Sequence, residues 1–324
     1  MIVVTGGAGF IGSAIVWRLN TLGKENIMVV DELGNDEKWK NLTGLHFTDF
    51  INKHDFLEMI ETGKLNFSAR AIIHMGANSS TTEKNADHLL KNNYEYTKTL
   101  AKYSCKNNIR FIYASSAATY GDGLNGFLDD EENISELRPL NMYGYSKTLF
   151  DLWAKRNGLF DKIVGIKYFN VYGPNEYHKG DMRSVVHKAY EQIVETGKVK
   201  LFKSLNKDYK DGEQKRDFVY VKDAVDMTLF FLNNEDKNGL YNVGAGTART
   251  WNDLVSAIFT AMNKPVNIEY IDLPPYLAAK YQYFTEANLG KIKKAGYPNP
   301  LLSLEEGVTD YVQNYLITEK YLGS

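Results

Sequence analysis

The chain has 324 residues, of which 38 are Lys or Arg and 40 are Asp or Glu, so its formal net charge is -2. This near-neutral balance gives no electrostatic reason to expect a nucleic-acid partner, and a 44% share of hydrophobic residues excludes a disordered chain. The single cysteine cannot form an internal disulfide, and no CxxC or HxxxH spacing occurs, so we expect neither a disulfide scaffold nor a bound metal.

The start of the chain favours a cytoplasmic protein. Met1 is followed by a short apolar run and then by glycines, without the basic region and long apolar stretch of a secretory signal. No run of about eighteen apolar residues occurs anywhere, so no segment is expected to cross a membrane. We therefore expect a small molecule as the partner, and neither a nucleic acid nor a membrane.

Short apolar runs alternate with longer amphipathic segments through the first half of the chain. This alternation predicts βαβ units and a parallel sheet, that is, an α/β fold of the Rossmann type with a doubly wound sheet. Helical patterns cover residues 12–22 and 92–106. The predicted strands cover residues 2–4, 27–30, 71–74, 110–115, 163–168, 218–221 and 240–243.

The length suggests two domains, and the strand signals become less regular after residue 170. We expect residues 1–170 and about 217–245 to form a dinucleotide-binding Rossmann domain. The remaining segments, about 171–216 and 246–324, are expected to form a smaller, interleaved C-terminal domain that binds the substrate.

A glycine-rich segment at residues 6–12, Gly-Gly-Ala-Gly-Phe-Ile-Gly, fits the GxGxxG pattern between the first predicted strand and the following helix. Asp31 ends the second predicted strand, 31 − 12 = 19 residues after Gly12, where a carboxylate normally binds the ribose hydroxyls of NAD. Three lysines follow that can neutralise a 2′-phosphate instead, so the residues alone leave NAD and NADP open. These lysines are Lys38, Lys40 and Lys53.

A Tyr-x-x-x-Lys pattern indicates acid–base chemistry. Tyr143 and Lys147 are one helical turn apart, so both side chains lie on one face. An ammonium beside a phenol lowers the pKa of the phenol and lets it remove a proton from an alcohol. Ser116 follows a predicted strand, at the edge where polar groups gather in α/β folds, and can bind the same hydroxyl.

These segments together resemble the extended short-chain dehydrogenases/reductases that modify nucleotide sugars. Further segments fit the 6-epimerase subfamily, which inverts C6 of ADP-D-glycero-β-D-manno-heptose through a transient 6-keto intermediate in lipopolysaccharide core synthesis. The resemblance covers nearly the whole chain. The matching segments are residues 5–12, 74–83, 113–121, 143–147, 169–180, 215–223 and 242–246.

The resemblance implies a tightly bound NADP in each subunit, with NAD the less favoured alternative. It also implies a homo-oligomer built on a pentamer. The residues that match the family's cofactor contacts are Gly6, Gly9, Phe10, Ile11, Gly12, Asp31, Glu32, Lys38, Lys53, Met75, Gly76, Ala77, Asn78, Ser79, Asn92, Lys147, Val171 and Lys179.

Two residues match the acid/base pair of that family, Tyr143 and Lys179, while Lys147 matches the lysine at the nicotinamide ribose and Ser116 completes the catalytic set. Residues at eight positions are implied as substrate contacts. They are Ser79, Ser116, Asn170, Asp181, Lys188, Phe202, Arg216 and Tyr281.

Other interpretations remain open. Without the resemblance, Lys179 reads as a solvated charge, and Arg216 as either a diphosphate ligand or the partner of a nearby aspartate. Another nucleotide-sugar epimerase or a 4,6-dehydratase shares the Tyr/Lys pair, although Ala117-Ala118 stands where dehydratases carry an Asp-Glu pair. A non-catalytic NADP-binding protein is disfavoured, because binding alone does not require Ser116, Tyr143 and Lys147.

Overall fold

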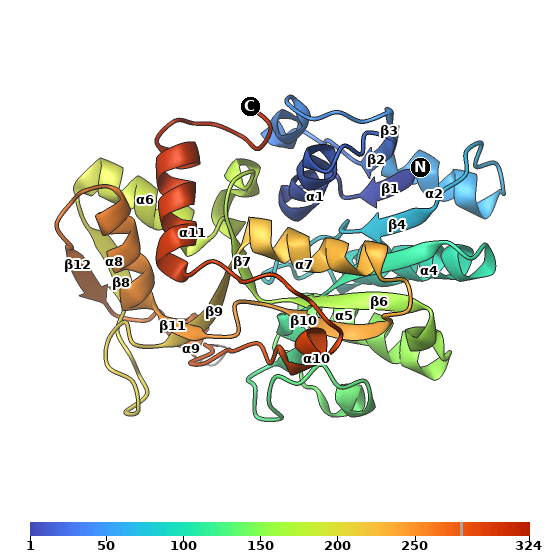
Figure 1. Ribbon diagram of the computed structural model, residues 1–324. Coiled ribbons are helices and arrows are strands. Elements are labelled where there is room, and N and C mark those ends of the chain that lie inside the picture. The colour runs from blue at the N-terminus through green and yellow to red at the C-terminus, as the bar shows by residue number, and fades with distance from the viewer. Residues whose placement is uncertain (279–280) are drawn as a thin grey trace.

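The computed structural model describes residues 1–278 and 281–324. Within these residues the central element is a seven-stranded parallel sheet in the order β10-β6-β5-β4-β1-β2-β3 (Figure 1). The doubly wound Rossmann-type fold is thereby confirmed. Its strands are β1 (Ile2–Thr5), β2 (Ile27–Asp31), β3 (Asp49–Asn52), β4 (Ala71–His74), β5 (Arg110–Ser116), β6 (Ile163–Tyr168) and β10 (Gly239–Val243).

Six of these strands were predicted to within one residue at each end, because each is a short apolar run buried on both sides. The exception is β3, which carries no such signal. It lies at the sheet edge and is exposed or only partly buried over its whole length. An edge strand buries little surface, so its sequence does not need a continuous apolar run.

Helices cover both faces of the sheet, and alternate strand residues serve the two faces. Ile2 and Val4 of β1 belong to the hydrophobic cluster under α1 and α7, while Val3 between them belongs to the cluster under α2, α4 and α5. The helices are α1 (Phe10–Thr21), α2 (Lys53–Glu61), α4 (Tyr96–Lys106), α5 (Met142–Arg156) and α7 (Val221–Asn233).

The helix predicted at 92–106 has two parts. Leu90–Glu95 forms a π-helical turn, and regular α-helix begins only at Tyr96. Such turns occur often at functional sites, and this one places Asn93 beside both the segment after β4 and helix α5.

A second group of elements lies at one end of the molecule, to the left in Figure 1. It contains a three-stranded sheet in the order β11-β9-β7 and a parallel pair of β8 and β12. The strands are β7 (Asn170–Tyr172), β8 (Val199–Phe202), β9 (Lys215–Tyr220), β11 (Ala248–Thr250) and β12 (Ile268–Ile271). The helices are α6 (Val185–Thr196), α8 (Trp251–Ala261), α11 (Leu304–Tyr311) and the short α9 (Pro275–Ala278). Two further short helices lie beside the main sheet instead: α3 (Ala86–Leu89) contacts α5, and α10 (Gly290–Lys294) contacts β10.

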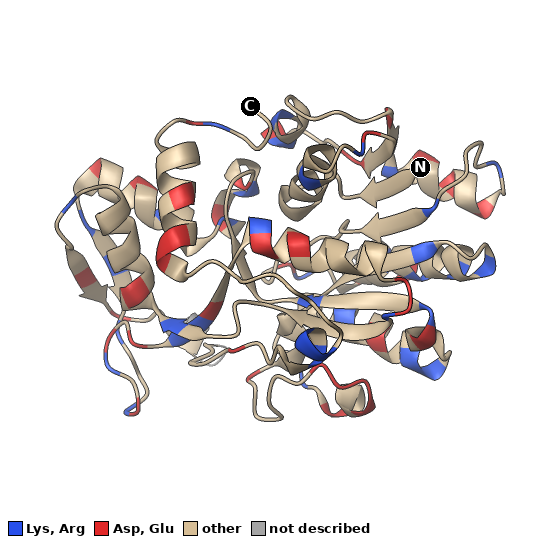
Figure 2. Ribbon diagram, in the orientation of Figure 1, with Lys and Arg blue, Asp and Glu red and all other residues tan. Residues whose placement is uncertain are grey.

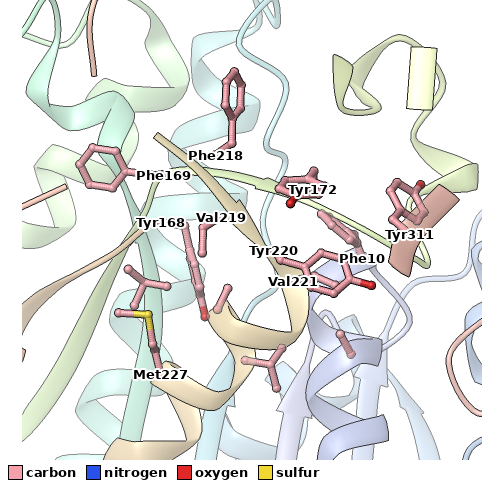
Figure 3. Close-up of a cluster of buried hydrophobic side chains, with 14 of the residues drawn as sticks. Phe10, Tyr168, Phe169, Tyr172, Phe218, Val219, Tyr220, Val221, Met227 and Tyr311 are labelled. Atoms are coloured by element: carbon pink, nitrogen blue, oxygen red, sulfur yellow. The ribbon is translucent and has the colours of Figure 1, made fainter. Parts of the chain in front are cut away.

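One hydrophobic cluster joins the two groups. Figure 3 shows Phe10 of α1 and Tyr168 at the end of β6 near Phe218 and Tyr220 of β9 and Tyr311 of α11. Strand β10 pairs with β6, and α7 packs on α1, whereas β9 pairs with β7 and β11 in the small sheet. The domain boundaries given above stay a prediction.

The outer edge of β10 is occupied by side chains of a preceding loop. Glu131 accepts a hydrogen bond from the Leu240 N–H at 2.7 Å, and Asp129 accepts one from the Asn242 N–H at 2.8 Å. Their spacing of two residues matches the period at which strand N–H groups point outward. The two carboxylates therefore take the place of a neighbouring strand.

Acidic and basic residues alternate over the elements in view (Figure 2). Among the described residues, no helix combines the length and apolar character needed to cross a bilayer. The same residues contain no group of three or more His, Cys, Asp or Glu side chains placed to hold a metal ion.

Candidate functional site

The glycine-rich turn brings backbone unusually close to backbone. Gly6 follows β1 with φ +68°, and a Cβ placed on it would lie 2.5 Å from the Gly76 nitrogen. A Cβ on Gly12 would lie 2.0 Å from the Gly6 carbonyl oxygen. Helix α1 begins at Phe10 with Gly9 as its N-cap, which supplies no capping side chain. The first N–H groups of α1 are therefore available to a phosphate.

A cleft of about 680 Å³ opens beside this turn, where β1, β4, β5 and β6 end. This is the edge at which α/β folds bind ligands. Most of the predicted site residues line it. They are Gly6, Gly9, Phe10, Ile11, Gly12, Asp31, Lys38, Met75, Gly76, Ala77, Asn78, Ser79, Ser116, Tyr143, Lys147, Asn170, Val171 and Lys179.

A smaller cavity of about 260 Å³ lies on the β2 side of the turn and contains the predicted residues Glu32, Lys53 and Asn92. Two lysines here pair with the two acids that follow β2. Lys38 Nζ is 3.1 Å from Asp31 Oδ1, and Lys53 Nζ is 2.5 Å from Glu32 Oε2. The hydrogen bond from Lys53 lowers the pKa of the Glu32 carboxyl. Both lysines thus line the smaller cavity, each paired with an acid.

Asp31 has a structural task as well. Its Oδ2 accepts a hydrogen bond from the Ala8 N–H at 2.9 Å, which ties the glycine turn to the end of β2. The dinucleotide fits this cradle on three observations: the blocked Cβ positions, the uncapped helix and the acid–lysine pairs. Gly6, Gly9 and Gly12 would hold its pyrophosphate, and Asp31, Lys38 and Lys53 would hold its ribose end.

Tyr143 and Lys147 project from one face of α5 into the cleft. The helix is fixed at its start by Asn141, whose side chain accepts a hydrogen bond from the Gly144 N–H at 2.8 Å. Lys147 is buried, its Nζ donates to the Ala114 carbonyl at 2.7 Å, and burial lowers its pKa to about 8. Desolvation raises the pKa of the Tyr143 phenol, and a hydrogen bond with Ser116 opposes that rise.

Lys179 enters the same cleft from the loop between β7 and α6. Its Nζ lies 5.2 Å from the centre of the Phe10 ring, and burial lowers its pKa while the Glu176 charge opposes the shift. Glu176 is fully buried and accepts hydrogen bonds from Ser184 Oγ at 2.6 Å and the Gly173 N–H at 3.4 Å. Glu176 thus holds the loop on either side of Lys179, whose side chain is half-buried in the cleft.

Arg216 is buried in an aromatic setting. Its guanidinium lies 5.6 Å from the ring centres of both Trp251 and Tyr281, and burial lowers its pKa to about 10. It makes no ion pair with any described residue, and Asp217 instead accepts hydrogen bonds from the backbone at Ala245 and beyond. The interpretation of Arg216 as an internal ion-pair partner is therefore wrong.

Five predicted substrate contacts line neither cavity of the described chain. Lys188 donates a hydrogen bond to the carbonyl of Asp181, which is exposed, and Phe202 ends β8. The five are Asp181, Lys188, Phe202, Arg216 and Tyr281.

The structure also adds cleft residues that the sequence did not single out, because no local motif marks them. They include Met182, Arg183, Ser184, Trp251 and Leu254.

Comparisons with known proteins agree with this geometry. Residues 2–244 match the model of the NAD dependent epimerase/dehydratase family. A relative from Nitratidesulfovibrio vulgaris Hildenborough, "ADP-L-glycero-D-manno-heptose-6-epimerase", is 55% identical over 98% of each chain. One of the same name from Fusobacterium nucleatum is 49% identical over 98% of this chain and 99% of its own. The crystal structure of the Helicobacter pylori protein of that name has a TM-score of 0.80 at 30% identity, over 97% of this chain and 95% of its own.

Proposed function

This chain belongs to the NAD dependent epimerase/dehydratase family, and we propose from that premise that it converts ADP-D-glycero-β-D-manno-heptose to the L-glycero epimer at C6. The observation that carries the proposal is a cleft with two separate proton-transfer groups. Tyr143 comes from α5 and Lys179 from the loop after β7, and both line the cleft beside the glycine turn. Two such groups suit a reaction that inverts a hydroxyl, because the oxygen points in opposite directions before and after the inversion.

The proton steps follow from these side chains. Tyr143, which is hydrogen-bonded to Ser116 and one helical turn from Lys147, takes the proton of the C6 hydroxyl as C6 is oxidised to a 6-keto group. The ketone then presents its other face, and Lys179 supplies the proton to the oxygen as C6 is reduced again. A nicotinamide dinucleotide held at Gly6, Gly9 and Gly12 would supply the hydride chemistry at C6 in both directions, so that the reaction involves no net oxidation.

The experiment that tests this function is direct. Purified protein is incubated with ADP-D-glycero-β-D-manno-heptose without added cofactor, and the C6 epimers are resolved. Conversion is expected, with no solvent deuterium at C6 when the reaction runs in D2O. Deuterium at C6 would show that the reaction deprotonates C6 rather than removing a hydride from it. No conversion, even with added NADP, would reject the proposed substrate.

We propose NADP as the cofactor, because Lys38 and Lys53 supply two ammonium groups in the smaller cavity. The double variant Lys38→Met/Lys53→Met should bind NADP about 10²- to 10⁴-fold more weakly, since it loses two charged hydrogen bonds that each contribute on the order of 1.5–3 kcal/mol. Affinity for NAD should change less than about 3-fold, as measured by calorimetry on cofactor-free protein. Lys40→Met, which removes an exposed pair with Glu37, is the matched control. Equal losses of affinity for NADP and NAD would show that the two lysines do not bind a 2′-phosphate, and NAD would then be the cofactor.

We propose that Arg216 binds the substrate diphosphate, although it lines neither cavity in this structure, because it is a buried cation 5.6 Å from the ring centre of the cleft residue Trp251. Its guanidinium has no carboxylate partner among the described residues and donates instead to the backbone carbonyls of Lys215 and Gln282. Arg216→Met should raise KM for the nucleotide sugar about 10- to 100-fold, with kcat changed far less. Steady-state kinetics measures this, with Arg249→Met as control, since Arg249 pairs with the exposed Glu305 at 2.6 Å. A wild-type KM for Arg216→Met would remove it from the substrate site.

A further inference from the structure

A buried polar cluster lies beside the Tyr143/Lys147 pair and reaches the cleft wall at Ser115. Its centre is Asp151, which follows Lys147 by one turn of α5 and is fully buried. The carboxylate accepts hydrogen bonds from Tyr113 Oη at 2.7 Å and Ser115 Oγ at 2.8 Å, and Lys167 Nζ lies 3.1 Å away. Three elements therefore meet at this one side chain: α5, β5 and β6.

Lys167 is as deeply buried as its partner. Only 1% of its side chain is exposed, its Nζ donates to Thr119 Oγ1 at 2.6 Å, and it lies 4.9 Å from the centre of the Tyr120 ring. Desolvation of two charges offsets most of their attraction, so a buried ion pair adds little stability over apolar residues of similar size. The stability of the fold does not by itself account for this pair.

The geometry relates the cluster to the reacting groups. Tyr113 and Ser115 point from β5 toward Asp151, while the next residue, Ser116, hydrogen-bonds with Tyr143. Lys147 also bonds to this strand, through the Ala114 carbonyl. Asp151 thus links α5 to β5 through two residues, Tyr113 and Ser115, which stand on either side of the Ala114 carbonyl that Lys147 contacts.

We propose that Asp151 is a positioning residue for the reaction. Its hydrogen bonds hold α5 in the register that sets Tyr143 and Lys147 against Ser116, and its charge keeps Lys147 in the ammonium form. Lys167 holds the Asp151 carboxylate in place as its counter-ion. The inference rests on the proposed function only for the role of Tyr143 as the base.

The charges around the cluster give the direction of the pH effect. Burial lowers the pKa of Lys147 to about 8, and the Asp151 charge opposes that shift. The other charged or titratable groups packed here include Lys167 on β6, Tyr113 on β5 and Tyr120 after β5. His74 on β4 faces Lys147 as well, and burial together with the Lys147 charge lowers its pKa to about 3, so it is neutral over the working pH range. Removal of the Asp151 charge lets the pKa of Lys147 fall further, so Lys147 loses its proton, and Tyr143 its cationic neighbour, at a lower pH.

The first test is Asp151→Asn, a change of similar size. We expect kcat for epimerisation to fall about 10- to 100-fold, less than loss of the base itself, with KM within about 3-fold. The alkaline limb of the kcat–pH profile should move about one pH unit toward acid. Unchanged kcat and an unchanged profile would overturn the proposal.

A matched control is available in α11. Asp310 also accepts from a tyrosine and a lysine, Tyr220 Oη at 2.6 Å and Lys222 Nζ at 2.7 Å, but it lies outside the cleft. Asp310→Asn should lower the melting temperature and leave kcat and its pH profile as in the wild type. An equal fall of kcat in this variant would assign the Asp151 effect to general loss of stability.

A double variant covers the case in which Asp151→Asn does not fold. Asp151→Asn/Lys167→Met leaves no unpaired charge, so it should fold with a melting temperature close to that of the wild type. It should still have a low kcat and an alkaline limb displaced toward acid, because Lys147 has lost the same carboxylate. Wild-type kinetics in the double variant would reduce the cluster to a structural role.

An NMR titration of Tyr143, which requires no substrate turnover, tests this inference independently of the proposed function. The protein is labelled with 13Cζ-tyrosine in the presence of NADP, and the Tyr143 signal is identified by its absence from Tyr143→Phe. Its titration should move to higher pH in Asp151→Asn and stay in place in Asp310→Asn. If the wild type does not epimerise the heptose but this shift occurs, only the proposed function fails; an unmoved Tyr143 signal refutes the inference even in an active epimerase.

Discussion

Replacement of Tyr143 by phenylalanine is expected to lower kcat for interconversion of the two C6 epimers by about 10³-fold, the scale of a lost general base. The change removes one oxygen, which is both the proton acceptor and the partner of Ser116. The ring remains, so α5 and the cofactor cradle are left in place. Steady-state kinetics from each epimer measures the effect, and calorimetry checks that NADP affinity is unchanged within about 3-fold.

The control is Tyr145→Phe, two residues further along the same helix. Tyr145 is 46% exposed and does not line either cavity described above, so the same loss of a hydroxyl should leave kcat unaltered. If Tyr143→Phe retained wild-type turnover, the proton would have to be taken by another group, and the mechanism proposed for this cleft would be wrong.

Replacement of Lys179 by methionine is the second change with a large expected effect, about 10²- to 10³-fold in kcat. Methionine keeps the length of the side chain beside Phe10 but removes the proton. Oxidation by Tyr143 should survive, so mixing the variant with the D-glycero epimer should produce reduced nicotinamide and the 6-ketone without release of the L epimer. Stopped-flow absorbance of the nicotinamide measures this half-reaction.

Lys203→Met serves as the control for a lost lysine, because Lys203 forms an exposed pair with Asp272. Two outcomes would contradict the role given to Lys179. One is normal turnover of Lys179→Met. The other is complete loss of the oxidation half-reaction, which would place Lys179 on the same side of the chemistry as Tyr143.

Local sequence predicted the parts of the site that depend on neighbouring residues. The glycine turn and the Tyr143–Lys147 spacing are local constraints, because backbone approach and one helical turn are decided within about seven residues. Strands such as β1 and β6 were equally readable, since burial on both sides demands an apolar run.

The roles of site residues whose partners lie far away in the sequence could not be predicted from local sequence. Lys179 was assigned from family resemblance alone, and only the fold shows that Glu176 holds its loop in the cleft. Arg183 and Trp251 line the cleft without any motif. Asp151 carries no sequence signal at all, because its partners on β5 and β6 are contributed by other segments of the chain.

The two carboxylates on the outer edge of β10 also limit how copies of this chain can associate. A sheet edge with free N–H groups can recruit a strand from another molecule by β-augmentation, which ends in fused sheets or in aggregates. Here Glu131 and Asp129 already occupy the N–H groups of Leu240 and Asn242. A sheet continued across β10 into a second copy of this chain would therefore first have to displace both acids.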